Sequence, residues 1–129
     1  MTFIVDRIDH VVLNCRDVER TVDWYMRVLG MRREVFGEGR TALVFGRQKL
    51  NVRPTGAPNW ETGAVDAPGS LDLCFIASEP LDAVIIRLDE LKATIIEGPV
   101  LRTGATSRIR SVYLRDPDRN LIEISELHP

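Results

Sequence analysis

The chain has 129 residues, of which 44% are hydrophobic and 28% charged, and this is enough for one domain with a buried core. Its formal net charge of −2 argues against nucleic acid or anionic membranes as the main partner. No apolar run approaches the length needed to cross a membrane, and the N-terminus lacks a basic region followed by a long apolar core. We therefore expect a cytoplasmic protein.

The first half of the chain predicts one strand, one helix and three short strands, in that order. The strand spans Arg7–Cys15. The helix follows from Asp17, whose side chain caps it, to Leu29, where Gly30 supplies the stop. The short strands, separated by glycine-bearing turns, are expected at 31–36, 41–45 and 49–53.

The second half repeats this plan. A strand is predicted at Leu71–Ala77, and apolar residues at helical spacing predict a helix at Pro80–Lys92. A strand beginning at Thr94 leads into a loop around Gly98-Pro99 and Gly104. The last hairpin is predicted from two strands, Arg108–Arg115 and Asn120–Ile124, around the turn Asp116-Pro117-Asp118-Arg119.

An internal repeat therefore organises the chain, since both halves read strand, helix, strand, strand, strand. We predict an α+β fold and a single domain over 1–129, made of module 1 at about 5–53 and module 2 at about 70–126. The linker at 54–69 is rich in proline and glycine and carries one large aromatic residue, Trp60. Trp60 either covers a pocket or anchors the linker.

Superposing the halves brings polar residues to equivalent strand positions. Superposing the opening strand of each half places His10 over Asp72, and aligning KLNVR with LIEIS places Asn51 over Glu123. Strand interiors usually prefer Val or Ile, so these side chains are candidate ligands or hydrogen-bonding groups. Glu123 lies on the face opposite its isoleucine neighbours, where a carboxylate must be solvated, paired or bound to a cation.

The repeat, IDHVVLNCRD, PGSLDLCF, and GPVLRTGA followed by SVYLRDPDRNLIEIS together resemble the vicinal oxygen chelate superfamily, the glyoxalase, bleomycin-resistance and extradiol-dioxygenase group. The likeness covers nearly the whole chain, and DPDRNLIE is its most specific part. With FGRQKLNV, the chain is similar to small glyoxalase-domain proteins, some described as virulence-associated. The resemblance implies a cupped, incomplete β-barrel with helices outside, whose two modules hold a divalent metal. It also implies a homodimer in which module 1 of one chain faces module 2 of its partner.

The resemblance implies that His10 and Glu123 are metal ligands, because the first-strand histidine and last-strand glutamate of the family fall on them. Asp72 falls on a ligand position that is often histidine, and Asn51 falls on the glutamate position of glyoxalases. The only other histidine is His128, so the site with two histidines and one carboxylate is not available, which disfavours extradiol dioxygenation. One nitrogen with two or three oxygen donors suits Mn²⁺, Mg²⁺, Ni²⁺ or Fe²⁺ and is compatible with Zn²⁺.

Such an ion would act as a Lewis acid that holds two vicinal oxygens of a small substrate. The resemblance therefore implies lyase or isomerase chemistry, with Glu123 or Asp72 as the base where it is not fully engaged as a ligand. Ser111 and Tyr113 match positions that face the pocket in fosfomycin-resistance relatives. Both are expected to bind and orient the substrate, and Tyr113 is also a candidate catalytic residue.

Arg53 supports an alternative function. It lies two residues after Asn51 on the same strand face, about 7 Å along the strand. A guanidinium there would neutralise Asp72 or Glu123 in place of a metal, which predicts a non-catalytic protein that binds or sequesters a small molecule. Arg53 would equally clamp an anionic group of the substrate, with Asn51 beside it, or be a solvent-exposed strand end.

Three arginines around Gly104 are typical of a solvated edge that discourages strand pairing, and such loops also bind anions; they are Arg102, Arg108 and Arg110. The cysteines, Cys15 and Cys74, lie inside apolar strand-like runs and are predicted to be buried free thiols.

Overall fold

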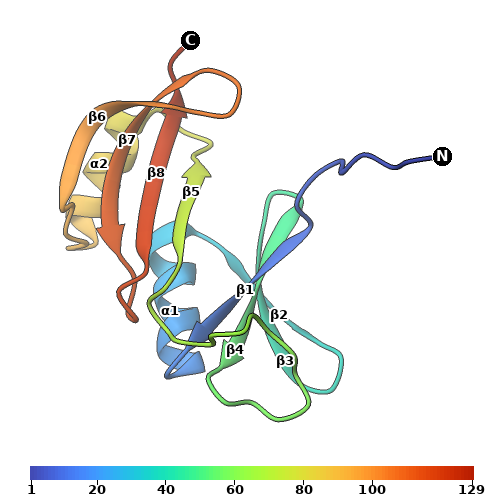
Figure 1. Ribbon diagram of the computed structural model, residues 1–129. Helices are drawn as coiled ribbons and strands as arrows, with labels where there is room; N and C mark the ends of the chain where they lie inside the picture. The colour runs from blue at the N-terminus through green and yellow to red at the C-terminus, as the bar shows by residue number, and fades with distance from the viewer. The chain divides into compact units, whose positions relative to one another are not determined.

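The computed structural model describes residues 1–129, which separate into two compact units, Met1–Ala67 and Pro68–Pro129 (Figure 1). Each unit contains one four-stranded sheet and one helix. The α+β class and the two βαβββ modules predicted from the repeat are therefore confirmed. Neither helix has the length and apolar content that a membrane-spanning helix needs.

Unit 1 is an open sheet with the strand order β1-β4-β3-β2. Strand β1 runs parallel to β4, and the other neighbours are antiparallel. Residues before His10 form no regular secondary structure, so the first strand begins later than the predicted Arg7. The elements are β1 (His10–Cys15), α1 (Val18–Leu29), β2 (Arg32–Phe36), β3 (Arg40–Phe45) and β4 (Gln48–Pro54).

Helix α1 begins and ends at the predicted residues. The Asp17 carboxylate accepts a hydrogen bond from the backbone N–H of Arg20 at 3.1 Å, and Gly30 ends the helix in the left-handed conformation, with φ of 67°. The helix contacts β2, β3 and β4 and buries Val22 and Tyr25. The alternate strand residues that share this core are Leu13, Cys15, Leu43, Leu50 and Val52.

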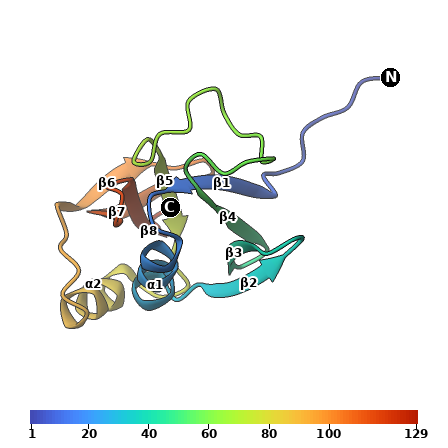
Figure 2. The same cartoon turned by 90° about the horizontal axis from the view of Figure 1, so that it is seen from below.

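Unit 2 has the strand order β5-β8-β7-β6, with the same parallel and antiparallel pattern, and Figure 2 shows α2 on one side of this sheet. The strand predicted to begin at Thr94 begins at Glu97 instead. It runs through Gly98-Pro99, where a loop was predicted, with an irregularity in its pairing to β7 between Glu97 and Val100. The elements are β5 (Asp72–Ile76), α2 (Leu81–Glu90), β6 (Glu97–Thr103), β7 (Arg108–Arg115) and β8 (Leu121–Leu127).

The predicted tight turn between β7 and β8 is confirmed and is held by one carboxylate. Asp116 Oδ1 accepts the backbone N–H groups of Asp118 at 3.0 Å and Asn120 at 2.9 Å. Asn120 Oδ1 in turn accepts the N–H of Leu71 at 2.9 Å, which ties the turn to the residue before β5. Gly69 packs against the same turn, where a Cβ atom would lie 2.5 Å from the carbonyl oxygen of Asp118.

The strand registers confirm the predicted superposition of the halves. In unit 1, Val12 on β1 pairs with Asn51 on β4. In unit 2, Cys74 on β5 pairs with Glu123 on β8. The residues two positions before Val12 and Cys74 are the ones that the superposition made equivalent. Because side chains alternate along a strand, they share the face of Asn51 and Glu123, opposite the core.

Candidate functional site

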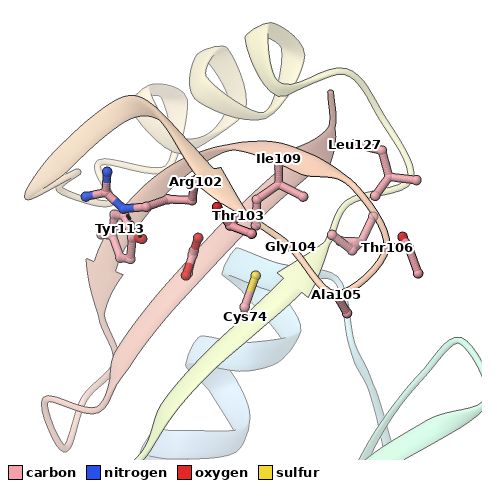
Figure 3. A pocket seen from close by; sticks show the side chains of 11 residues that line it. Cys74, Arg102, Thr103, Gly104, Ala105, Thr106, Ile109, Tyr113 and Leu127 are labelled. Atoms are coloured by element: carbon pink, nitrogen blue, oxygen red, sulfur yellow. Dashed lines mark hydrogen bonds between the residues drawn. The ribbon is translucent and has the colours of Figure 1, made fainter. Parts of the chain in front are cut away.

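A pocket of about 440 Å³ lies on the unit 2 sheet (Figure 3). Ile122 and Ile124 are buried, so the alternate residue Glu123 faces the other side of β8, where the pocket forms. The residues from Thr103 to Thr106 pass over one edge of the pocket. Besides the threonines of this segment, its polar lining residues are Cys74, Arg102, Tyr113 and Glu123, and its larger apolar ones are Ile76, Ile109 and Leu127.

Tyr113 stands between a cation and a carboxylate. It is the cross-strand partner of Glu123, and Arg102 Nε donates a hydrogen bond to Tyr113 Oη at 3.1 Å. Burial raises the pKa of Tyr113, the bond from Arg102 opposes this, and the hydrogen bond and negative charge of Glu123 raise the pKa further. The phenol is therefore kept protonated and able to donate a hydrogen bond.

Cys74 is not the buried thiol that the sequence predicted. It is exposed and lines the pocket, whereas Cys15 is buried as expected. Its Sγ atom lies 3.3 Å from Ser125 Oγ, which also donates to Glu123 Oε2 at 3.5 Å. Partial burial raises the pKa of the Cys74 thiol, and the negative charges of Glu123 and Asp72 add to this. The sequence missed Cys74 because β5 has apolar residues on both faces.

The three predicted metal ligands are divided between the units. Asp72 and Glu123 lie on the same face of the unit 2 sheet, while His10 lies at the start of β1 in unit 1. His10 Nδ1 is 3.0 Å from Asp9 Oδ2, and this hydrogen bond lowers the pKa of Asp9. No group of three or more His, Cys, Asp or Glu side chains that could hold a metal occurs in the structure. The ligand set therefore stays a prediction.

Asn51 carries the one buried side-chain oxygen or nitrogen atom in the structure that has no hydrogen-bond partner. Only 7% of the residue is exposed, and its Oδ1 atom is buried without a hydrogen-bond partner. Leaving a buried acceptor unpaired costs about 1–3 kcal/mol. Oxygen donors of this type suit a divalent cation, so Asn51 and the Asp72 and Glu123 carboxylates are chemically compatible with the predicted metal.

Arg53 is buried in unit 1 and is not a solvent-exposed strand end. It is 5% exposed and donates to Asn14 Oδ1 at 2.9 Å and to Asp66 Oδ2 at 3.0 Å. It also donates to the backbone carbonyls of Trp60 at 3.2 Å and Ala57 at 3.2 Å. Asp66 thus pairs with the charge of Arg53 inside unit 1, and the hydrogen bonds of Arg53 hold the segment after β4.

Trp60 lies beneath the guanidinium of Arg40, 4.1 Å from its ring centroid, and so anchors the linker within unit 1. Ser111 is fully buried and does not line the pocket; its Oγ is 2.6 Å from Ser125 Oγ. Ser111 therefore supports Ser125 instead of contacting a substrate directly. Ser125 itself was not recognised, because a serine in a strand gives no distinguishing signal.

The model of the Glyoxalase/Bleomycin resistance protein/Dioxygenase superfamily matches residues 7–124. The chain belongs to this superfamily. It is 46% identical over 123 residues to virulence protein STM3117 of Salmonella typhimurium strain LT2, covering 95% of this chain and 85% of that protein. It is also 46% identical over 121 residues to the glyoxalase domain-containing protein RDO1 of Mycosarcoma maydis, covering 94% of this chain and 68% of that one.

Solved structures share the fold over nearly the whole chain. The crystal structure of STM3117 superposes with a TM-score of 0.95 at 45% identity, covering 98% of this chain and 100% of that one. More distant structures, which show the fold alone, include a lactoylglutathione lyase from Agrobacterium tumefaciens, with a TM-score of 0.71 at 23% identity, covering 95% of this chain and 94% of that chain. They also include the antibiotic binding protein TnmS3 from Streptomyces sp. CB03234, with a TM-score of 0.75 at 19% identity, covering 98% and 100%.

Proposed function

We propose that this protein is a divalent-metal-dependent lyase or isomerase that acts on a small substrate with two neighbouring oxygen atoms. The observation that carries the proposal is Glu123, a half-buried carboxylate that lines a pocket of about 440 Å³ next to Tyr113. Membership of the glyoxalase superfamily supports this reaction class. The proposed ion is Mn²⁺, Mg²⁺, Ni²⁺, Fe²⁺ or Zn²⁺.

The proposed ligands are His10, Asp72 and Glu123. Unit 2 supplies two carboxylates, and unit 1 supplies the imidazole and the unpaired oxygen of Asn51. We propose that they meet in an exchanged homodimer, in which module 1 of one chain faces module 2 of the other. The segment before β1 supports a partner chain, because it carries several exposed apolar side chains close together, and such groups mark interaction surfaces. They include Phe3 at 86%, Ile4 at 92%, Val5 at 75% and Ile8 at 62% exposed.

When bound, the ion would supply Lewis-acid stabilisation of negative charge on the substrate oxygens. A Glu123 carboxylate oxygen not engaged as a ligand accepts the proton that the substrate loses. Tyr113 Oη accepts a hydrogen bond from Arg102, and its own O–H donates to Glu123. A bound substrate oxygen would take over this O–H from Glu123. Ser125, held by Ser111, positions the Glu123 carboxylate through its own hydroxyl.

A non-catalytic protein that binds or sequesters a small molecule in the same pocket is the second candidate. The shared fold of the antibiotic binding protein TnmS3 supports it. The form in which Arg53 replaces the metal loses its support, because Arg53 pairs with Asp66 in unit 1. Binding without catalysis would therefore depend on the pocket of unit 2 alone.

Metal analysis of the full chain separates the two candidates. Protein purified without added ions is expected to hold about one divalent ion per chain, and a His10→Ala, Glu123→Ala double variant to hold none. His128→Ala is the matched control, because this histidine lies outside the proposed site. The His128→Ala protein should therefore keep its metal. Negligible metal in all three proteins would contradict the enzyme proposal. A sedimentation mass of one chain at micromolar concentration would contradict the exchanged dimer.

A further inference from the structure

Arg102 offers the pocket a cationic group that the proposed chemistry does not consume. Its guanidinium lies 5.5 Å from the ring centroid of Tyr113, and both residues line the same end of the pocket (Figure 3). Nε donates to Tyr113, Nη1 to the carbonyl of Leu101 at 3.2 Å, and Nη2 to Glu97 Oε1 at 2.9 Å. Each terminal nitrogen of a guanidinium carries two N–H groups, so one on each has no protein partner.

Glu97 orients this guanidinium and, because the pair is in contact with water, neutralises it for a ligand only in part. The Glu97 side chain is 57% exposed and does not line the pocket. An ion pair in contact with water contributes little free energy, so the main effect of Glu97 is to orient the guanidinium. The bond to Tyr113 fixes the opposite edge of the same group. A carboxylate that enters the pocket would therefore meet a pre-oriented planar cation, the partner that suits carboxylates best.

An apolar wall begins directly beside Arg102. Ile109 pairs across β6 and β7 with Arg102 and across β7 and β8 with Leu127, so the three side chains share one sheet face. Leu127 is 52% exposed and lies at the end of the pocket away from Arg102, as Figure 3 shows. Exposed apolar side chains in a pocket gain free energy when an apolar group covers them, and of these two side chains Leu127 offers the exposed area, because Ile109 is only 5% exposed.

We propose that this pocket binds a small carboxylate with an apolar substituent. Arg102 binds the carboxylate, the apolar substituent lies along Ile109 and Leu127, and the oxygen-bearing carbon lies near Tyr113 and Glu123. The inference rests on the proposed function because it names the substrate class of the same site. It does not depend on the metal, since the groups that carry it all lie in unit 2.

The test measures the affinity of the full chain for matched probes by calorimetry. The probes are 2-oxo-4-methylpentanoate, its uncharged amide, and pyruvate, which keeps the oxo acid and lacks the branched substituent. The acid is expected to bind at least about 10-fold more tightly than the amide, as charge-assisted hydrogen bonds require, and more tightly than pyruvate. No saturable binding of the acid at millimolar concentration, or equal binding of acid and amide, would overturn the proposal.

Three variants assign the effect to Arg102. Arg102→Gln is expected to remove the preference for acid over amide, while Arg108→Gln, an exposed arginine outside the pocket lining, keeps it. Glu97→Gln removes the competing carboxylate and is expected to tighten binding of the acid by about 2- to 5-fold. This gain cannot arise from misfolding, so it tests the proposal even if Arg102→Gln is unstable. An unchanged preference in Arg102→Gln, or weaker binding in Glu97→Gln, counts against it.

Each titration is carried out on the metal-free protein and again with Mn²⁺ added. A preference that depends on Arg102 in both forms supports the inference whether or not the protein is an enzyme. If Mn²⁺ does not bind but the preference remains, the metal-dependent function fails and the carboxylate pocket stands. If Mn²⁺ binds and no preference exists, the reverse holds.

Discussion

Replacement of Arg53 by methionine tests whether this arginine is a structural anchor. Its side chain is 6% exposed and donates to three uncharged acceptors, Asn14 Oδ1 and the carbonyls of Trp60 and Ala57. At about 1 kcal/mol per bond these sum to about 3 kcal/mol. Water reaches some of the freed acceptors, which reduces the expected loss to about 2 kcal/mol. The ion pair with Asp66 is left out of this figure because solvent screens it.

The loss is measured as the free energy of unfolding in urea, with Arg47→Met as the control. Arg47 is exposed in the turn between β3 and β4, so its replacement should change stability by no more than about 0.5 kcal/mol. In Arg53→Met, the segment that Arg53 holds should also open more often while the rest of the protein stays folded. Chymotrypsin is therefore expected to cleave after Trp60 faster in Arg53→Met than in Arg47→Met.

Two results would refute this reasoning. The first is a loss below about 0.5 kcal/mol with unchanged cleavage after Trp60, since a buried arginine with four hydrogen bonds cannot then be an anchor. The second is a rise in bound divalent metal in Arg53→Met. That rise would mean that the guanidinium had been occupying the cation site, as the alternative function requires.

Three shorter predictions follow from single contacts. Arg53 lowers the pKa of Asp66 below its ordinary 3.8, so the ion pair stabilises the fold above about pH 4, and this stabilisation is lost as the pH falls through the lowered pKa. The midpoint of urea unfolding, measured from roughly pH 5 downward, should therefore fall less steeply with pH in Asp66→Asn. Iodoacetamide should modify Cys74 in the folded protein, and because the pKa of this thiol is raised, the rate should still be rising at pH 9.0. Modification of Cys15 first, or a rate that levels off below that pH, would contradict this prediction. Gly69→Ala should destabilise unit 2 by about 1–3 kcal/mol in thermal unfolding, because φ is +85° and the added Cβ meets Asp118 O at 2.5 Å; an unchanged midpoint would be inconsistent with this packing.

The parts of the fold that local chemistry determines were predictable from the sequence. The Asp17 cap, the Gly30 stop and the turn at Asp116 each depend on residues within a few positions of one another. The repeat gave the equivalence of Asn51 and Glu123, which the strand registers confirm. Inward and outward positions on these strands followed because alternation needs only one buried residue as a reference.

The errors arose where tertiary contacts override a local signal. Gly98-Pro99 indicates a loop, yet pairing with β7 extends β6 through these residues. Arg53 could be placed on a strand face, but its partner Asp66 lies 13 residues away in a segment without regular structure, which no periodicity reveals. Arg102 was one of three arginines around a glycine, and only the hydrogen bond to Tyr113 in the folded structure shows where its guanidinium lies.

The two modules use equivalent strand positions for opposite purposes. Arg53 lies two residues after Asn51, and Ser125 lies two residues after Glu123, so these two positions are equivalent. Their partners on the neighbouring strands, Asn14 and Ile76, are equivalent as well. In unit 2, Ile76 lines the pocket. In unit 1 the equivalent place is occupied, because Arg53 donates to Asn14 and Asn14 donates to Thr62 at 3.5 Å.

This difference limits what module 1 can contribute to the proposed site. Arg53 closes the C-terminal end of β4, whereas His10 lies at the start of β1, which runs parallel to β4, and Asn51 lies between these ends. An imidazole and an unpaired amide oxygen therefore remain as the groups that module 1 can offer a cation, and we propose that module 2 makes the substrate contacts. Substitutions at His10 should accordingly change metal content and leave the affinity of the metal-free protein for carboxylates unchanged. Weaker carboxylate binding in metal-free His10→Ala would show that this separation of roles is wrong.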